Sequence, residues 1–146
     1  MRRALQRSWP AIMVAPLAAW LFLPAAGSPP ACLAGNGVGA GAPPTVVYVG
    51  ADDCAPCRRF NEERWPAIRR SARNIDLREV RSPTFRDVLD DEYWAADLRP
   101  YRNAIPPEAG VPLWVVVCNN SVVKVAWGVR QWDDQVMPLL YGAIAR

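Results

Sequence analysis

Residues 46–60 read VVYVGADDCAPCRRF. The β-branched run predicts a buried strand over Thr45–Val49, and Cys54 and Cys57, spaced Cys-x-x-Cys, open a segment with helical spacing. This order places Cys54 at a strand-to-helix junction. The first-turn N–H groups of a helix lack backbone partners there, and the aligned peptide dipoles favour negative charge. We therefore expect Cys54 to be an activated thiol with Cys57 one helical turn away.

The chemistry of this pair depends on how readily Cys54 ionises. An ordinary thiol with a pKa of about 8.5 is only about 3% ionised at pH 7, and helix N-termini and Cys-x-x-Cys motifs lower that pKa. Asp52 and Asp53 oppose the effect, because a carboxylate about 4 Å away in a water-like dielectric costs about 0.7 pK unit. We expect the helix terminus and the Cys-x-x-Cys motif to lower the pKa of Cys54 by more than the two carboxylates raise it, so the motif indicates a dithiol–disulfide redox centre.

Two other interpretations of the cysteine pair are an inert buried pair and half of a zinc site. A structural zinc ion needs four ligands, the chain has no histidine, and Cys32 and Cys118 each stand alone. We predict no metal. Cys118 lies in a predicted buried strand and is expected to fill the core. Cys32 is either an incidental thiol or the partner of Cys118 or of another protein.

The N-terminus has the features of an export signal. Arg2, Arg3 and Arg7 precede an apolar stretch over residues 11–26, and residues 25–27 offer a small-residue cleavage site. We expect a signal peptide over residues 1–27, with a retained membrane anchor as the alternative, because the apolar stretch is short for a bilayer span. Residues 28–44, rich in Gly, Pro and Ala, predict a flexible linker, and residues 45–146 predict one domain.

Charge excludes one class of partner. The three N-terminal arginines supply the whole net charge of +3, and the remaining 14 basic residues balance the 14 acidic ones. A nucleic-acid-binding protein would show a basic face, so we expect no nucleic-acid partner.

Beyond the motif, the pattern predicts the order β-α-β-α-β-β-α. Pro66 should kink the first helix, and Ser82-Pro83 is typical of a helix start, with Phe85, Val88 and Leu89 on one side of the helix that follows. Residues 90–107 predict irregular helix and loop. The remaining elements are a strand at Ile75–Val80, a fully buried strand at Leu113–Cys118, a turn at Asn119–Ser121, a returning strand at Val122–Trp127 and a last helix at about Gln131–Ala145. The fold class is α/β, with a central mixed sheet and helices on both faces.

Gly110-Val111-Pro112 enters the buried strand. A proline there must sit at the first residue of the strand, because it cannot donate to the ladder. If the Val111–Pro112 bond is cis, the backbone groups of Val111 face outward and can pair with an extended peptide. Trp114, two residues further on, is a candidate to flank the same groove.

From Thr45 to Ala145 the chain resembles the thioredoxin family. The resemblance rests on the strand–Cys54-Ala55-Pro56-Cys57–helix unit, on Val111-Pro112 before a buried strand, and on the hairpin and amphipathic helix that follow. It implies a thioredoxin-like fold in which Cys54 attacks, Cys57 resolves the mixed disulfide, and a cis Pro112 lies beside the sulfurs. Val111, Pro112, Ala55 and Pro56 would contact the substrate.

The chain departs from the family pattern at two positions. Asp53 stands where thioredoxins usually carry Trp, and Tyr48 stands where they carry a buried acid implicated in proton transfer from the second cysteine. Without that acid, Cys57 would lose its proton to water, or to Asp52 or Asp53 if they reach it.

We therefore expect an exported thiol–disulfide oxidoreductase without a cofactor. Its partners would be protein thiol or disulfide substrates and a redox partner protein, and the chain would be a monomer. It would be periplasmic or otherwise extracytoplasmic, or tethered to the inner membrane through residues 11–26. The alternatives are a binding module whose Cys54–Cys57 disulfide is structural and a Cu(I) metallochaperone; the absence of histidine and of nearby methionine argues against the second. The direction of electron flow stays open, because the reduction potentials of such proteins span about −270 to −120 mV.

Overall fold

The computed structural model describes residues 32–33 and 42–144. The predicted signal peptide, residues 1–27, and most of the predicted linker lie outside the described residues. Within the described part of the chain, no helix has the length and apolar character needed to cross a membrane.

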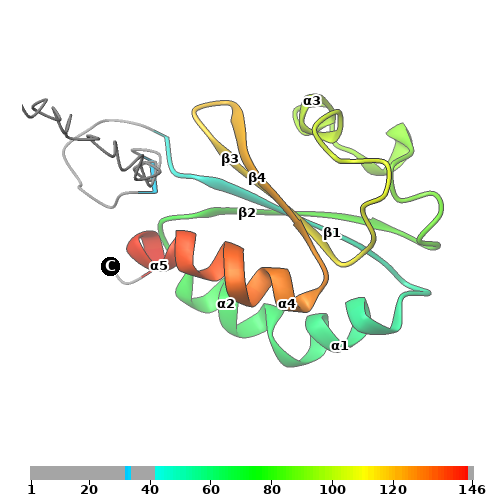
Figure 1. Cartoon of the computed structure of the whole chain (residues 1–146), viewed down its shortest axis with the longest axis horizontal. Coiled ribbons are helices and arrows are strands. Elements are labelled where there is room, and N and C mark those ends of the chain that lie inside the picture. Colours follow the sequence, from blue (N-terminus) through cyan, green and yellow to red (C-terminus); the bar gives the residue numbers. More distant parts are fainter. Residues whose placement is uncertain (1–31, 34–41, 145–146) are drawn as a thin grey trace, which may run out of the picture.

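A four-stranded mixed sheet forms the centre of the domain (Figure 1). Its strand order is β2-β1-β3-β4, with β1 and β2 parallel and the β1–β3 and β3–β4 pairs antiparallel. The two central strands are almost wholly apolar because both of their faces are covered, whereas the edge strands carry charged residues, four on β2 and Lys124 on β4. The strands are β1 (Thr45–Ala51), β2 (Asp76–Ser82), β3 (Leu113–Cys118) and β4 (Ser121–Trp127).

Most of the helical structure covers one face of the sheet, and the segment between β2 and β3 covers the other (Figure 1). On the first face, Phe60, Trp65 and Leu140 pack against Tyr48 and Trp114. On the second, Val88, Trp94 and Leu98 pack against alternate residues of β1 and β3. The helical elements are α1 (Ala55–Glu63), α2 (Trp65–Ser71), the 3-10 turn η1 (Asp91–Tyr93), α3 (Arg99–Arg102), α4 (Val129–Gln131), the π-helical turn η2 (Trp132–Val136) and α5 (Met137–Ile144).

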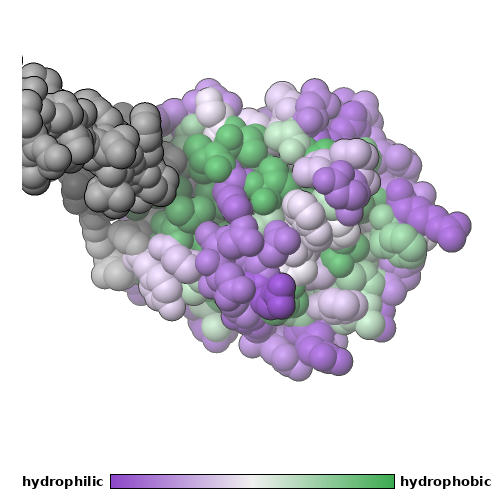
Figure 2. All heavy atoms as spheres, viewed as in Figure 1, coloured by the Kyte–Doolittle hydropathy of each residue, from purple (hydrophilic) through white to green (hydrophobic). Residues whose placement is uncertain are grey.

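This arrangement confirms the predicted α/β, thioredoxin-like fold class, including the mixed sheet with cover on both faces. The hairpin turn also lies where it was predicted: Asn119 and Asn120 both adopt positive φ, as a tight two-residue β-turn requires. On the visible side of the molecule, hydrophobic residues gather near this hairpin, and further hydrophobic residues lie among hydrophilic ones elsewhere on that face (Figure 2).

Prolines interrupt the regular α-helical pattern of both long helical segments. The predicted kink at Pro66 is a full break, and α1 ends at Glu63 before α2 begins at Trp65. The predicted last helix is divided into α4, η2 and α5. Pro138 has no N–H to donate to the carbonyl four residues earlier, and the wider π-helical turn immediately precedes this region.

The helix predicted to start at Ser82-Pro83 is absent, and that prediction was wrong. Ser82 is the last residue of β2, opposite Ala51, and its Oγ donates to the Thr84 carbonyl at 2.6 Å instead of capping a helix. Residues 83–90 form successive turns. Val88 is buried as expected, but Phe85 is 54% exposed.

A second disulfide links Cys32 to Cys118, at the end of β3. The Cα atoms of the two residues are 5.9 Å apart, and 86 positions separate them in the sequence. Cys118 lies in the core as predicted, and of the alternatives left open for Cys32 the structure shows the pairing with Cys118. Leu33 follows Cys32 into the core on the helical face of the sheet.

Candidate active site

The sheet topology brings the two sequence motifs to one edge. Because β1 and β3 are antiparallel, the residues that follow β1 lie beside the residues that precede β3. Ala51, Cys54 and Cys57 form a small buried cluster against which Val111 packs. The Val111–Pro112 peptide bond is cis, as the resemblance implies, and the Pro112 carbonyl accepts the Gly128 N–H at 2.7 Å. That bond fixes the proline turn to the end of β4.

Cys54 and Cys57 form a disulfide at the start of α1, with their Cα atoms 5.2 Å apart. Cys54 is the N-cap of the helix, and its Sγ accepts a hydrogen bond from the Cys57 N–H at 3.1 Å. The same sulfur lies 3.7 Å from the Val111 carbonyl oxygen. A backbone N–H directed at Cys54 Sγ would stabilise a thiolate there once the disulfide is reduced.

The two cysteine residues differ in their exposure to solvent. Cys54 is 8% exposed and Cys57 is 0% exposed. Ala55 and Pro56, between them, are both exposed. A substrate can therefore approach Cys54 along this surface, while Cys57 is screened behind it.

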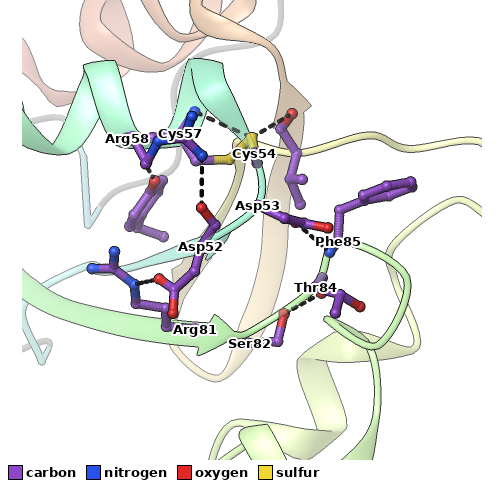
Figure 3. The surroundings of a disulfide bond; sticks show 11 residues. Asp52, Asp53, Cys54, Cys57, Arg58, Arg81, Ser82, Thr84 and Phe85 are labelled. Atoms are coloured by element: carbon purple, nitrogen blue, oxygen red, sulfur yellow. Dashed lines mark hydrogen bonds and ion pairs between the residues drawn. A yellow bond between two sulfur atoms is a disulfide. The ribbon is translucent and has the colours of Figure 1, made fainter.

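Asp52 and Asp53 are both engaged away from the sulfurs (Figure 3). The Asp52 carboxylate pairs with Arg81, and this hydrogen bond raises the pKa of the Arg81 guanidinium. The Asp53 Oδ1 accepts the Phe85 N–H at 2.8 Å. Arg58 adds a positive charge beside the turn, donating to the Asp52 carbonyl oxygen at 2.7 Å. Both carboxylates thus accept hydrogen bonds that stabilise the turn, and neither carboxylate is hydrogen-bonded to Cys57.

Tyr48 lies beneath the pair, where the resemblance led us to expect an acid. It is fully buried, and its hydroxyl donates to the Cys57 carbonyl oxygen at 3.4 Å. Burial, and secondarily the negative charge of Glu79, raise the pKa of Tyr48 to about 12. Its ring passes over Gly50, where an added Cβ would meet the hydroxyl oxygen at 2.6 Å. Tyr48 is therefore a neutral hydrogen-bond donor below the site and is not a base at neutral pH.

Trp114 does not flank the substrate groove, and that expectation was wrong. It is fully buried, with its ring centroid 4.8 Å from that of Phe60 and 5.0 Å from that of Trp132. Trp114 belongs to an aromatic cluster that supports α1 from below, because residue 114 of β3 points to the helical face of the sheet.

Two features near the disulfide were missed from the sequence. A hollow of about 250 Å³ runs along α1 from Ala55 and Pro56 to Val129, with Arg59 and Glu63 on its rim. The exposed Phe85 lies next to Asp53 (Figure 3). The hollow forms by tertiary packing, and no local sequence pattern predicts it. The spacing of residues 85, 88 and 89 predicted a helix, and on that helix Phe85 would have been buried.

Residues 32–33 and 42–144 contain no group of three or more histidine, cysteine or acidic side chains placed to hold a metal ion. The chemistry that this arrangement can support directly is thiol–disulfide exchange at Cys54 and Cys57.

Comparisons with known proteins add a likeness of fold. No family model matches the chain, and no curated protein matches it. Among solved structures, it is similar to the solution structure of oxidised thioredoxin from Plasmodium falciparum, with 17% sequence identity and a TM-score of 0.46. The likeness covers 69% of this chain and 81% of that one. The strand order and the cover of the sheet define the fold, and the candidate site is defined by its own geometry.

Proposed function

We propose that this chain is an exported thiol–disulfide oxidoreductase that uses Cys54 and Cys57 to reduce or exchange disulfides in protein substrates. One observation carries the proposal: the more accessible sulfur, Cys54 Sγ, caps α1, receives the Cys57 N–H, and lies beside the cis Val111–Pro112 turn. An inert structural pair would not require the first sulfur to be presented at a helix N-terminus. Export and an extracytoplasmic location are proposed from the apolar N-terminal segment.

The reaction begins at Cys54 of the reduced protein. The Cys54 thiolate attacks one sulfur of a substrate disulfide, the substrate S–S bond breaks, and the other substrate sulfur leaves as a thiolate that takes a proton from water. The product is a mixed disulfide between Cys54 and the substrate. The Cys57 N–H stabilises the attacking thiolate, which lowers the free energy of the reactive form.

Cys57 completes the exchange. Its thiol loses a proton to water, and the resulting thiolate attacks Cys54 Sγ and releases the second substrate thiolate. Two electrons have then passed to the substrate, and Cys54–Cys57 is a disulfide. A dithiol partner protein must return two electrons for another cycle. The reverse sequence oxidises a substrate dithiol.

The surface around Cys54 supports a polypeptide substrate. Val111 lies half-buried beside the sulfurs and precedes β3, so its backbone can pair with an extended peptide that crosses the site. Exposed Ala55 and Pro56 offer small side chains on the other side, which leaves room for that backbone. We propose that the chain works as a monomer.

Insulin reduction by the full chain, with dithiothreitol as the electron donor, tests the proposal. The wild-type chain should accelerate precipitation of the insulin B chain, and Cys54→Ala should abolish the acceleration. Cys57→Ala should lose turnover but accumulate a mixed disulfide with insulin at Cys54, seen by mass spectrometry. A chain carrying both Cys32→Ala and Cys118→Ala is the matched control and should remain active. Equal rates for the wild type and Cys54→Ala would rule out the proposed function.

A further inference from the structure

Phe85 is an aromatic side chain left in solvent next to the redox site. In the described part of the chain the exposed large hydrophobic residues are Phe85 at 54%, Val123 at 36% and Tyr141 at 60%. Val123 lies on β4 and Tyr141 on α5. Phe85, in contrast, follows β2, which is parallel to β1 and ends opposite Ala51. The parallel pairing of β1 and β2 therefore places Phe85 at the same edge of the sheet as Cys54.

Three hydrogen bonds join the turn before Cys54 to the turn that carries Phe85. The Asp52 N–H donates to the Ser82 carbonyl at 3.0 Å, and the Asp53 N–H donates to the Pro83 carbonyl at 3.2 Å. The Asp53 carboxylate then accepts the Phe85 N–H at 2.8 Å. Figure 3 shows Phe85 beside Asp53, with its ring extending outward from the turn on the side away from the Cys54–Cys57 sulfurs. Asp53 thus fixes the backbone of Phe85 relative to the turn that precedes Cys54.

The Phe85 turn is also braced from within. Ser82 Oγ donates to the Thr84 carbonyl at 2.6 Å, and Thr84 Oγ1 donates to the Asp87 carboxylate at 2.7 Å. An aromatic ring held in water gives up the stabilisation that its burial would provide. A rigid turn that maintains this exposure beside a reactive group is typical of a residue that contacts a partner.

Arg86 places a positive charge over the ring. The Arg86 guanidinium lies over the Phe85 ring, 5.9 Å from its centroid. Within the described residues Arg86 forms no ion pair, whereas the carboxylates of Asp53 and Asp87 accept hydrogen bonds from the Phe85 N–H and the Thr84 hydroxyl. An apolar ring with an unpaired arginine over it complements a segment that carries an apolar and an acidic side chain.

We propose that Phe85 and Arg86 are specificity-determining residues for an extended polypeptide whose disulfide cysteine is flanked by an apolar and an acidic side chain. Asp53 is the positioning residue that holds them beside Cys54. This inference rests on the proposed function and names the substrate class of the same site.

Single-turnover reduction by the pre-reduced full chain tests it with three disulfides. One is a disulfide-linked peptide with phenylalanine and glutamate beside cysteine, the second is the same peptide with glycine and lysine at those positions, and the third is hydroxyethyl disulfide. The wild type should prefer the first peptide. Phe85→Ser should lower the rate constant for that peptide about tenfold. It should change the rate constant for hydroxyethyl disulfide less than about twofold, because the small disulfide does not reach the ring.

Matched variants separate the roles of the neighbouring residues. Tyr141→Ser removes an equally exposed ring on α5 and should leave all three rate constants unchanged. Arg86→Gln should reduce the preference for glutamate. Asp53→Asn keeps an oxygen that accepts the Phe85 N–H and should retain the preference, while Asp53→Ala should lose it.

The outcomes distinguish this inference from the proposed function. Turnover of hydroxyethyl disulfide with equal rates for the two peptides, or with the same loss in Tyr141→Ser as in Phe85→Ser, would overturn the specificity proposal alone. A wild-type chain that reduces none of the three disulfides would overturn both proposals.

Discussion

The Cys32–Cys118 disulfide is expected to supply a large part of the stability of the domain. It joins residues 86 positions apart, and removing such a cross-link restores about 4.6 kcal/mol of chain entropy to the unfolded state in the loop-closure model. A small domain is typically stable by about 5–15 kcal/mol, so the loss is a considerable fraction of the total. The full chain carrying both Cys32→Ala and Cys118→Ala should therefore unfold at a much lower urea concentration. With a slope of about 2 kcal/mol per M, the midpoint falls by about 2 M.

The second disulfide of the same chain provides the control. Cys54 and Cys57 are only 3 positions apart, and the same relation gives about 1.6 kcal/mol for removing that link through Cys54→Ala and Cys57→Ala. Urea unfolding followed by tryptophan fluorescence measures both losses. The Cys32/Cys118 variant should retain insulin reduction, because Cys118 lies at the end of β3 away from Pro112, about 20 Å along the chain. A loss below about 1 kcal/mol for the Cys32/Cys118 variant, or one no larger than for the Cys54/Cys57 variant, would refute this reasoning.

Three further predictions concern the floor and the reactive sulfur of the site. Gly50→Ala should lower the free energy of unfolding, measured in urea, by about 2 kcal/mol, because the added Cβ would lie 2.6 Å from the Tyr48 hydroxyl oxygen. Gly110→Ala is the control: no atom lies within 4 Å of its added Cβ, so the free energy of unfolding should change by less than about 0.5 kcal/mol. Burial raises the pKa of Tyr48 from 10.0 to about 12, so between these pH values the unfolded chain ionises first and stability that is present below pH 10 is lost as the pH rises towards 12. The urea midpoint should therefore decline less over this pH range in Tyr48→Phe than in the wild type, and an equal decline would contradict the raised pKa of Tyr48. In the reduced chain, Cys54 should be alkylated faster than Cys57 and should reach half its maximal rate at a pH below about 8.5, the ordinary thiol value, whereas a higher midpoint would show that Asp52 and Asp53 dominate over the helix terminus.

The strands and the redox motif were predictable because their signals are local. The runs of valine around Tyr48 and before Cys118 can only be buried, and Cys-x-x-Cys after the first run marks the start of a helix. The position of Pro112 at the start of a buried strand was predictable, because a proline inside that strand would remove a ladder hydrogen bond. These features were sufficient for the order of the strands, and the resemblance to the thioredoxin family predicted that Cys54 and Pro112 meet.

The turn that carries Phe85 and the Cys32–Cys118 pairing depend on contacts between residues distant in the sequence, which local patterns do not predict. Phe85 was expected on a helix because residues 85, 88 and 89 share helical spacing, but the Ser82 hydroxyl and the Asp53 carboxylate take up the backbone groups around it and hold a turn instead. The pairing of Cys32 with Cys118 was one of several options, since the aperiodic stretch around Cys32 fixes no position relative to β3.

The reduction potential of the Cys54–Cys57 pair tests the central claim most directly. The full chain is equilibrated in a series of dithiothreitol redox buffers, and the thiols are trapped and assigned by mass spectrometry. A redox centre should titrate reversibly as a two-electron couple with a midpoint between about −270 and −120 mV, which would also give the direction of electron flow. A pair that stays oxidised below about −300 mV would be a structural disulfide and would contradict the account.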